Sequence, residues 1–197
     1  QFDEETMMMR FGALFLLAAG SVVMSPAQMP GGQPDVTQQQ TYTLHRASSA
    51  DSTGRNADFK TVPPGATVTV LDTDGPGVIS HIWFTINDQE PYHLKRIVLR
   101  IYWDGEATPS VETPIGDFFG LGLGTYNNWK SEMLSVGSVK AMNSYFPMPS
   151  RHHARITVTN EGKRPLGSMS YNVDYRTEAP TLPASPSSSN TKTSSSP

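Results

Sequence analysis

One stretch constrains the fold more than any other: residues 96–103 (RIVLRIYW) followed by Asp104-Gly105. β-Branched and aromatic residues dominate it, which favours a strand, and Asp-Gly is the strongest short signal for a tight hairpin turn. The chain then passes Pro109 and Pro114, which fits an edge or a loop and not a central strand. It reaches residues 116–120 (GDFFG), where two large aromatics lie between glycines. The pattern predicts a strand, a turn and a loop of an all-β domain, with an aromatic-lined site at the loop.

Alternation of apolar and polar residues recurs along the chain. It is strongest in residues 78–86 (VISHIWFTI), where Ile82, Phe84 and Ile86 face one way and His81, Trp83 and Thr85 face the other. Further strands are expected at residues 67–71, 154–158 and 169–175, with Gly-, Pro- and Asn-rich turns between them.

This spacing of strands and turns is typical of a sandwich or barrel, and the lack of a helical period argues against a parallel βαβ sheet. We therefore predict an all-β fold, a single jelly-roll β-sandwich. Its core should contain Ile82, Phe84, Ile97, Leu99 and Ile156.

Charge and cysteine content exclude several classes of site. The 197-residue chain has a net charge of −3 and no cysteine. It offers no basic field for nucleic acid, so no nucleic-acid partner is expected. It can form neither disulfides nor a cysteine-type zinc site. His152 and His153 are adjacent and would point to opposite faces of a strand, and residues 120–124 (GLGLG) lack the spacing of a nucleotide-binding loop. We expect no metal and no other cofactor.

The two ends differ in composition from the part between them. Residues 7–27 pass from methionines and Arg10 through an apolar run to small residues that end at Ala27, the order of a secretory signal peptide. Residues 1–27 should therefore be a leader and signal peptide cleaved after Ala27. The mature protein would be secreted or periplasmic, without a membrane segment; a buried helix or a retained anchor is the alternative. We expect a flexible linker at residues 28–40, the jelly-roll domain at 41–177, and a disordered Ser/Pro/Thr-rich tail at 178–197.

Carboxylates are the residues to examine for hydrolysis of a sugar bond, which needs two of them flanking one site. Asp104 has an ordinary role in a turn, and Asp51 and Asp58 lie in a loop of small polar residues. Asp117 precedes Phe118 and Phe119, so it could be the polar group of an aromatic pocket. The spacing alone identifies no catalytic pair.

The order of several motifs resembles the first half of glycoside hydrolase family 172. The motifs are residues 46–58 (RASSADSTGRNAD), 74–85 (DGPGVISHIWFT), 99–120 and 143–149, followed by 154–160. The most specific are DGPG…HIW and GDFFG. The resemblance runs from about Arg46 to Tyr175. It implies a double jelly-roll protomer, retaining exo-hydrolysis of furanosides such as fructofuranosides or D-arabinofuranosides, and a homotrimer.

One departure from the family pattern bears on catalysis. The family's catalytic glutamates lie in the second jelly roll, in segments resembling G-E-G-D and G-T-G-T-E-D, and neither string occurs in this sequence. The resemblance therefore implies a first jelly roll without its C-terminal partner half, as a frameshift, an early stop or a fragmentary gene model would produce. No catalytic residue is carried over, and the chain is expected to be inactive alone. The alternative is a non-catalytic jelly-roll module that binds a glycan or a protein partner.

Five residues are predicted to contact a carbohydrate, and seven loop residues to form an exposed surface. The substrate-binding candidates are Asp58, Trp83, Asp117, Phe118 and Phe119. The loop residues are Phe118, Phe119, Tyr126, Trp129, Tyr145, Phe146 and Met148. The latter would form an apolar patch that a second half or oligomer contact normally covers; the alternative is that they pack inside their own domain.

Overall fold

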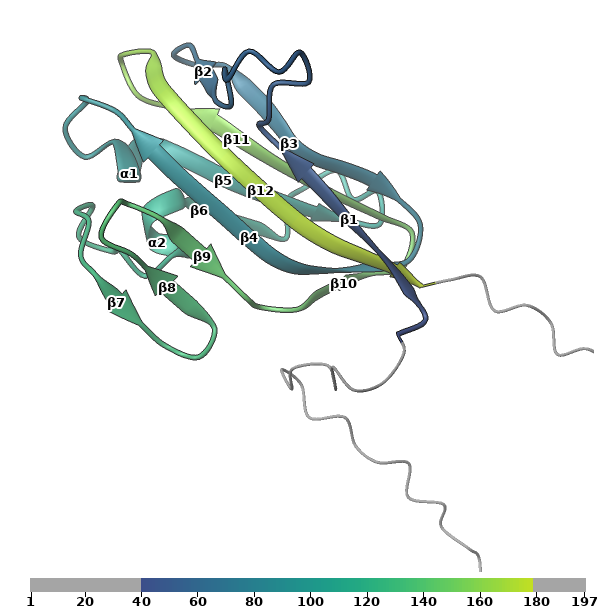
Figure 1. Cartoon of the computed structure of the whole chain (residues 1–197). Coiled ribbons are helices and arrows are strands. Elements are labelled where there is room, and N and C mark those ends of the chain that lie inside the picture. Colours follow the sequence, from purple (N-terminus) through teal and green to yellow (C-terminus); the bar gives the residue numbers. More distant parts are fainter. Residues whose placement is uncertain (1–39, 179–197) are drawn as a thin grey trace, which may run out of the picture. The chain divides into compact units, whose positions relative to one another are not determined.

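The structure is a computed structural model that describes residues 40–178, and these contain twelve strands and two short helices (Figure 1). The strands are β1 (Tyr42–Ser48), β2 (Lys60–Val62), β3 (Thr67–Asp74), β4 (Gly77–Asn87), β5 (Ile97–Trp103), β6 (Val111–Pro114), β7 (Trp129–Lys130), β8 (Leu134–Val136), β9 (Met142–Ser144), β10 (Met148–Ser150), β11 (His153–Asn160) and β12 (Leu166–Glu178). The helices are α1 (His93–Arg96) and α2 (Ile115–Phe118).

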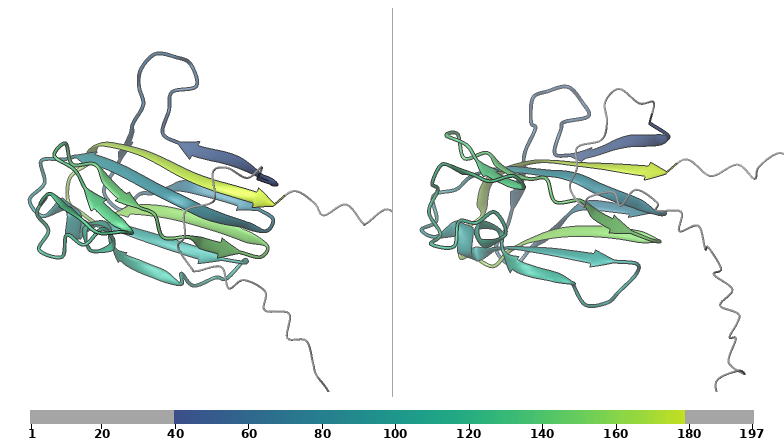
Figure 2. Two further views of the ribbon diagram at one scale, coloured as in Figure 1. Left: turned by 60° about the horizontal axis from the view of Figure 1, so that its bottom comes forward. Right: turned by 90° about the horizontal axis from the view of Figure 1, so that it is seen from below.

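The strands form two antiparallel sheets that face each other as layers (Figure 2). The larger sheet has the order β1-β12-β4-β9-β8-β7, with β2 paired to β12 and β10 paired to β4. The smaller sheet has the order β3-β11-β5-β6. Four strands in the order β1-β12-β4-β9 opposite four in the order β3-β11-β5-β6 make a jelly roll. The predicted all-β jelly-roll sandwich is confirmed.

β4 and β12 form the centre of the larger sheet. Their register runs from Ser168 opposite Asn87 to Thr177 opposite Gly77. It shifts once between Asp174 and Tyr175, where Ser80 is the extra residue on β4. Within β4 the buried residues Ile82, Phe84 and Ile86 alternate with partly exposed ones, as the sequence pattern predicts.

The core lies between the two sheets, and the five residues predicted for it are all there. Ile82, Phe84, Leu99 and Ile156 are 0% exposed and Ile97 is 1% exposed. Strands of both sheets supply them, so the apolar faces of the two layers bury each other. Full burial of an aliphatic or aromatic side chain contributes about 1.5–3 kcal/mol before entropy is counted.

Asp104 and Gly105 form the predicted turn. Both have positive φ angles, 52° and 83°, which is the pattern of the hairpin turns that favour Asp-Gly. The Asp104 carboxylate also accepts backbone hydrogen bonds from Arg151, His152 and His153, at 2.9, 2.7 and 3.2 Å. These bonds lower the pKa of the Asp104 carboxyl, the one from His152 most. One side chain thus fixes the turn after β5 and the loop before β11.

The prediction from the two prolines is confirmed: Pro109 lies in the loop before β6, and Pro114 ends β6, which is an edge strand of the smaller sheet. The two helices were not expected, because four residues are too few to show a helical period. They lie against each other at Gly116, where a Cβ atom would come 2.9 Å from the Leu94 Cβ. The absence of a side chain at Gly116 therefore allows α2 to pack closely against α1.

The expectation of a seven-residue exposed patch is wrong for five of its members. Phe119 is 0% exposed, and the other four pack against the core as partly buried residues: Phe118, Tyr126, Trp129 and Met148. The loops fold back over the open end of the sandwich and cover their own aromatics, the alternative that the sequence left open. Tyr145 and Phe146 stay exposed, at 43% and 44%.

The predicted signal peptide, linker and tail fall on residues 1–39 and 179–197 almost entirely, outside the described part of the chain. Between residues 40 and 178, no helix is long and apolar enough to cross a membrane.

Candidate functional site

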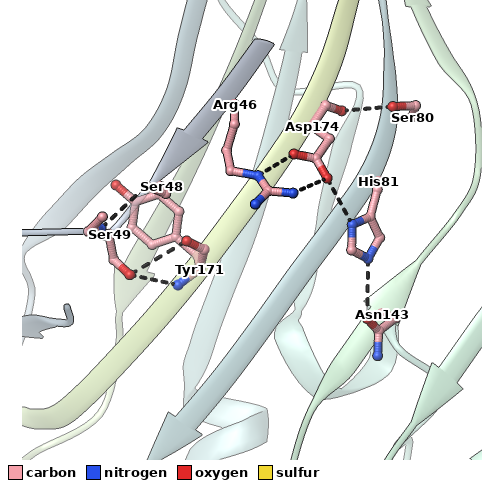
Figure 3. Close-up of polar contacts among 9 residues, drawn as sticks. Arg46, Ser48, Ser49, Ser80, His81, Asn143, Tyr171 and Asp174 are labelled. Atoms are coloured by element: carbon pink, nitrogen blue, oxygen red, sulfur yellow. Dashed lines mark hydrogen bonds and ion pairs between the residues drawn. The ribbon is translucent and has the colours of Figure 1, made fainter. Parts of the chain in front are cut away.

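A row of polar side chains crosses the outer face of the larger sheet over four neighbouring strands (Figure 3). The pairing places Arg46 of β1 opposite Asp174 of β12, and Asp174 opposite His81 of β4. Asn143 of β9 lies opposite Trp83, which follows His81 by two residues in β4. Each of these residues has core residues as its chain neighbours, such as Ala47, Val173, Ile82 and Met142. The alternation of the strands therefore turns the row away from the core.

Asp174 is the centre of this row. Its carboxylate accepts two hydrogen bonds from Arg46, at 2.6 Å from Nε and 3.0 Å from Nη2. The hydrogen bonds from Arg46, and to a smaller extent the contact with His81, hold the pKa of the Asp174 carboxyl below its ordinary value, although partial burial acts the other way. Its side chain is 14% exposed and that of Arg46 is 60% exposed. Asp174 is therefore a carboxylate, and not a proton donor, near neutral pH.

His81 connects Asp174 to β9. Its Nδ1 lies 3.2 Å from the Asp174 Oδ2, and its Nε2 lies 3.2 Å from the Asn143 Oδ1. Tyr145 covers one face of the imidazole, with ring centroids 4.7 Å apart and planes 8° from parallel. The ring is thus fixed at both nitrogens and on one face, which a loose surface histidine would not be.

The next row contains two side chains that lack hydrogen-bond partners among the described residues. Trp83, Asn143 and Asn172 are opposite one another across β9, β4 and β12, and each is partly exposed. Neither the Trp83 indole nor the Asn172 amide has a hydrogen-bond partner in the described part of the chain, and neither is a buried unsatisfied group. These donors face solvent and are available to a ligand.

This face lacks the pair of carboxylates that a retaining glycosidase uses. The row holds one carboxylate, kept ionised by a guanidinium, whereas retaining glycosidases need a nucleophile and a protonatable acid about 5–5.5 Å apart. Between residues 40 and 178 there is also no group of three His, Asp or Glu side chains that could hold a metal ion.

The structure does not bring the five predicted substrate-binding residues together. Trp83 lies on the outer face of the larger sheet, beside His81. Asp58 lies in the loop before β2, where its carboxylate accepts the Asp51 N–H at 2.7 Å, and its carbonyl accepts the hydroxyls of Ser49 and Ser170. Asp58 therefore braces its own loop against β12.

Asp117, Phe118 and Phe119 lie at the end of the sandwich, in and after α2. Asp117 accepts two hydrogen bonds from the Lys95 Nζ, at 2.6 and 2.8 Å. Phe119 contacts Phe84 in the core with ring centroids 6.1 Å apart, on the opposite side of the sheet from Trp83. A fully buried ring cannot contact a ligand, so the prediction that Phe119 binds substrate needs correction. Phe119 belongs to the core, and Phe118 packs against it.

The residues that sequence reasoning missed are Arg46, His81, Asn143, Tyr145, Asn172 and Asp174. Alternation did place His81 and Trp83 on the face opposite Ile82. However, which strands neighbour β4 depends on the topology, and the partners Asp174 and Asn143 lie 93 and 62 residues from His81. No local pattern could reveal that juxtaposition.

The fold and this face define a jelly-roll domain with a mixed aromatic and polar surface on its larger sheet. The family model described as GH172 domain-like matches residues 53–173, more than half of the chain. The chain belongs to this glycoside-hydrolase-related family, as the resemblance in its motifs indicates. No curated protein matches the chain.

Similarities to solved structures are remote. A chain of the infectious bursal disease virus Gt strain has 13% identity and a TM-score of 0.34, covering 72% of this chain and 33% of its own length. FlhE has 12% identity and a TM-score of 0.29, covering 70% of this chain and 100% of its own. The serine protease of Aeromonas sobria has 12% identity and a TM-score of 0.28, with coverages of 67% and 26%. The chain thus spans about a third of the viral chain, and we draw no conclusion on function from these similarities.

Proposed function

We propose that this domain is the first jelly roll of a glycoside hydrolase that acts on furanosides, fructofuranosides or D-arabinofuranosides, and that the chain does not hydrolyse them alone. Membership of the GH172 domain-like family supports the link to glycoside hydrolysis. The substrate class and the lack of activity go beyond that membership and are inferred from the motif resemblance and from the state of the carboxylates.

The observation that carries the proposal is that the candidate carboxylates have structural roles. The Asp104 carboxylate accepts hydrogen bonds from three consecutive backbone N–H groups leading into β11, those of residues 151–153. Glu90 accepts the backbone N–H groups of Lys163 and Arg164, which lower its pKa. A carboxyl group that must release such bonds to accept or donate a proton is a poor general acid.

One pair of carboxylates does come close. Glu112 and Glu161 both accept hydrogen bonds from the Nη2 atom of Arg100, at 3.1 and 2.8 Å. The shared guanidinium lies between them, where a retaining glycosidase would need the anomeric carbon of the sugar. Both side chains are about half exposed, so this group is a surface ion-pair network.

The catalytic pair would then come from a second jelly roll that packs on this one, within a trimer. We further propose that the protein is exported, on the basis of the signal-peptide pattern that ends at Ala27.

An activity assay tests the proposal. The purified chain is incubated with aryl arabinofuranosides and aryl fructofuranosides, and release of the aryl group is followed. We expect no turnover above the uncatalysed background, because general acid and nucleophile each contribute orders of magnitude. Turnover that disappears in Asp117→Asn or Asp58→Asn would contradict the proposal.

The second candidate function is a non-catalytic module that binds a glycan or a protein. The outer face around His81 favours it, since an ordered row of side chains lies beside donors that have no partner between residues 40 and 178. In the second function this face would bind its ligand without a catalytic domain, whereas in the first the domain works only together with a catalytic second jelly roll.

A further inference from the structure

We infer that the outer face of the larger sheet around His81 and Trp83 is a binding site for an uncharged sugar, with Tyr145 and Trp83 as its aromatic surfaces. The inference rests on the proposed function for the class of ligand, and on the geometry of the face for the residues. Neither the family match nor the motifs assign a ligand to Arg46, His81, Asn143, Tyr145 or Asn172.

The aromatic part comes from β4 and from the chain just after β9. Tyr145 is 43% exposed although one face of its ring is stacked on His81. Asp174 and Asn143 hold the His81 imidazole at its two nitrogens, and the stacked imidazole thereby fixes the orientation of the tyrosine ring. A fixed, exposed aromatic ring beside a partly exposed indole suits the apolar C–H face of a sugar ring, and its rigidity reduces the entropy lost on binding.

The polar part supplies hydrogen bonds of both kinds. The Trp83 Nε1–H is a donor, and the Asn172 amide has two donors and an acceptor. The Asn143 amide presents its second group while its Oδ1 contacts His81. A few polar groups beside apolar surfaces are the usual composition of a small-molecule site, and hydroxyl groups can use both donors and acceptors.

The charges of the row favour an uncharged ligand. Arg46 and Asp174 form a two-point ion pair across β1 and β12, so their formal charges offset each other. An anion would meet the Asp174 carboxylate, and a cation would meet the Arg46 guanidinium. The Arg46–Asp174 pair therefore contributes no net formal charge with which to select an ion.

Nuclear magnetic resonance of the ¹⁵N-labelled whole chain tests the inference. The probes are a fructo-oligosaccharide and an arabinofuranosyl oligosaccharide. We expect saturable shifts of the Trp83 indole and of the Asn143 and Asn172 side-chain amides, with a dissociation constant on the order of 1 mM for a shallow face. Trp83→Phe identifies the indole signal, because the other two tryptophans, Trp103 and Trp129, remain.

Two variants and one matched control locate the site. Trp83→Ala and Tyr145→Ala should each weaken binding about tenfold or more. Tyr145 is exposed enough for its truncation to leave the fold intact. Tyr102→Ala is the control: its ring stacks with Arg155 at 4.0 Å on the other sheet, and its loss should leave binding unchanged.

Three outcomes would overturn the inference. They are no saturable shift up to the solubility of both probes, binding that Trp83→Ala and Tyr145→Ala leave unchanged, or self-association of the chain through this face that excludes the probe. If the sugars bind here and the chain also hydrolyses aryl furanosides, the proposed inactivity fails and the inference stands. If neither binding nor hydrolysis occurs, the inference fails and the proposed function stands.

Discussion

His81 and Asp174 lie opposite each other in the register between β4 and β12, and their side chains meet at 3.2 Å beside the single shift in that register. The extra residue, Ser80, donates its hydroxyl to the Asp174 carbonyl at 3.2 Å. An irregularity next to a polar cluster is a common way to direct a side chain. Here it lies where Arg46, Asp174 and His81 come together.

Replacing Asp174 should lower stability in a pH-dependent way. The folded pKa of its carboxyl is depressed, so its contribution is present above the unfolded pKa of about 3.9 and is lost as the pH falls through the folded value. We expect Asp174→Asn to cost about 1 kcal/mol at pH 7, a modest value because Arg46 is largely exposed.

Urea unfolding at pH 7 and at pH 3 measures this effect. The difference between Asp174→Asn and the unmodified protein should shrink at the lower pH. Glu132→Gln is the control, because Glu132 is exposed and has no partner among the described residues. An equal cost at both pH values would show that the carboxylate charge is not what matters.

Phe119 should behave as a core residue. It is fully buried and contacts both Phe84 and Phe118 edge-on. Phe119→Ala should lower the free energy of unfolding by about 3–5 kcal/mol, whereas Phe146→Ala, at an exposed ring, should change it by less than about 0.5 kcal/mol. Denaturant unfolding of both variants gives the comparison, and similar values for the two would contradict the burial of Phe119.

Two glycines of the same loop should respond differently to alanine. Gly120 has a φ of +76°, and a Cβ there would lie 2.3 Å from the Trp129 Cζ2. Gly122 has open space within 4 Å and no positive φ. We expect Gly120→Ala to cost about 2 kcal/mol or more and Gly122→Ala about 0.5 kcal/mol or less.

Thermal unfolding of the two alanine variants, followed by tryptophan fluorescence, checks this difference. An unchanged melting temperature for Gly120→Ala would mean that the Trp129 ring can move aside at no cost. A large loss for Gly122→Ala would instead point to a contact that the structure lacks.

Asp104 should be replaceable by asparagine more readily than by alanine. Asparagine tolerates the left-handed conformation and retains an acceptor oxygen for Arg151, His152 and His153. Alanine retains neither. We expect the melting temperature to fall in the order wild type, Asp104→Asn, Asp104→Ala; equal values for the two variants would show that neither the conformation nor the acceptor matters.

The sequence alone predicted the fold class, the turn at Asp104-Gly105 and the outward-facing residues of β4. Alternation in residues 78–86 separates Ile82 from Trp83 without any knowledge of the neighbours. Asp104-Gly105 encodes its own turn. Both are local properties of the chain.

What the sequence could not provide is long-range. The aromatics at residues 118 and 119 resemble a pocket lining, but packing against Phe84 decides that Phe119 is core. Likewise Arg46 and Asp174 are separated by 128 residues and meet only because β1 pairs with β12. Strand order is a property of the whole sandwich, so no window of residues reveals it.

Covalent trapping tests the central claim, that the carboxylates of this chain are structural and not catalytic, most directly. A retaining glycosidase forms a covalent glycosyl–enzyme intermediate on its nucleophile, so arabinofuranose- and fructofuranose-configured electrophilic analogues should label any such group. We expect the intact mass of the chain to be unchanged after incubation with either analogue. An increase by one adduct, located by peptide mass spectrometry on a carboxylate such as Asp117 or Asp174, would contradict the claim.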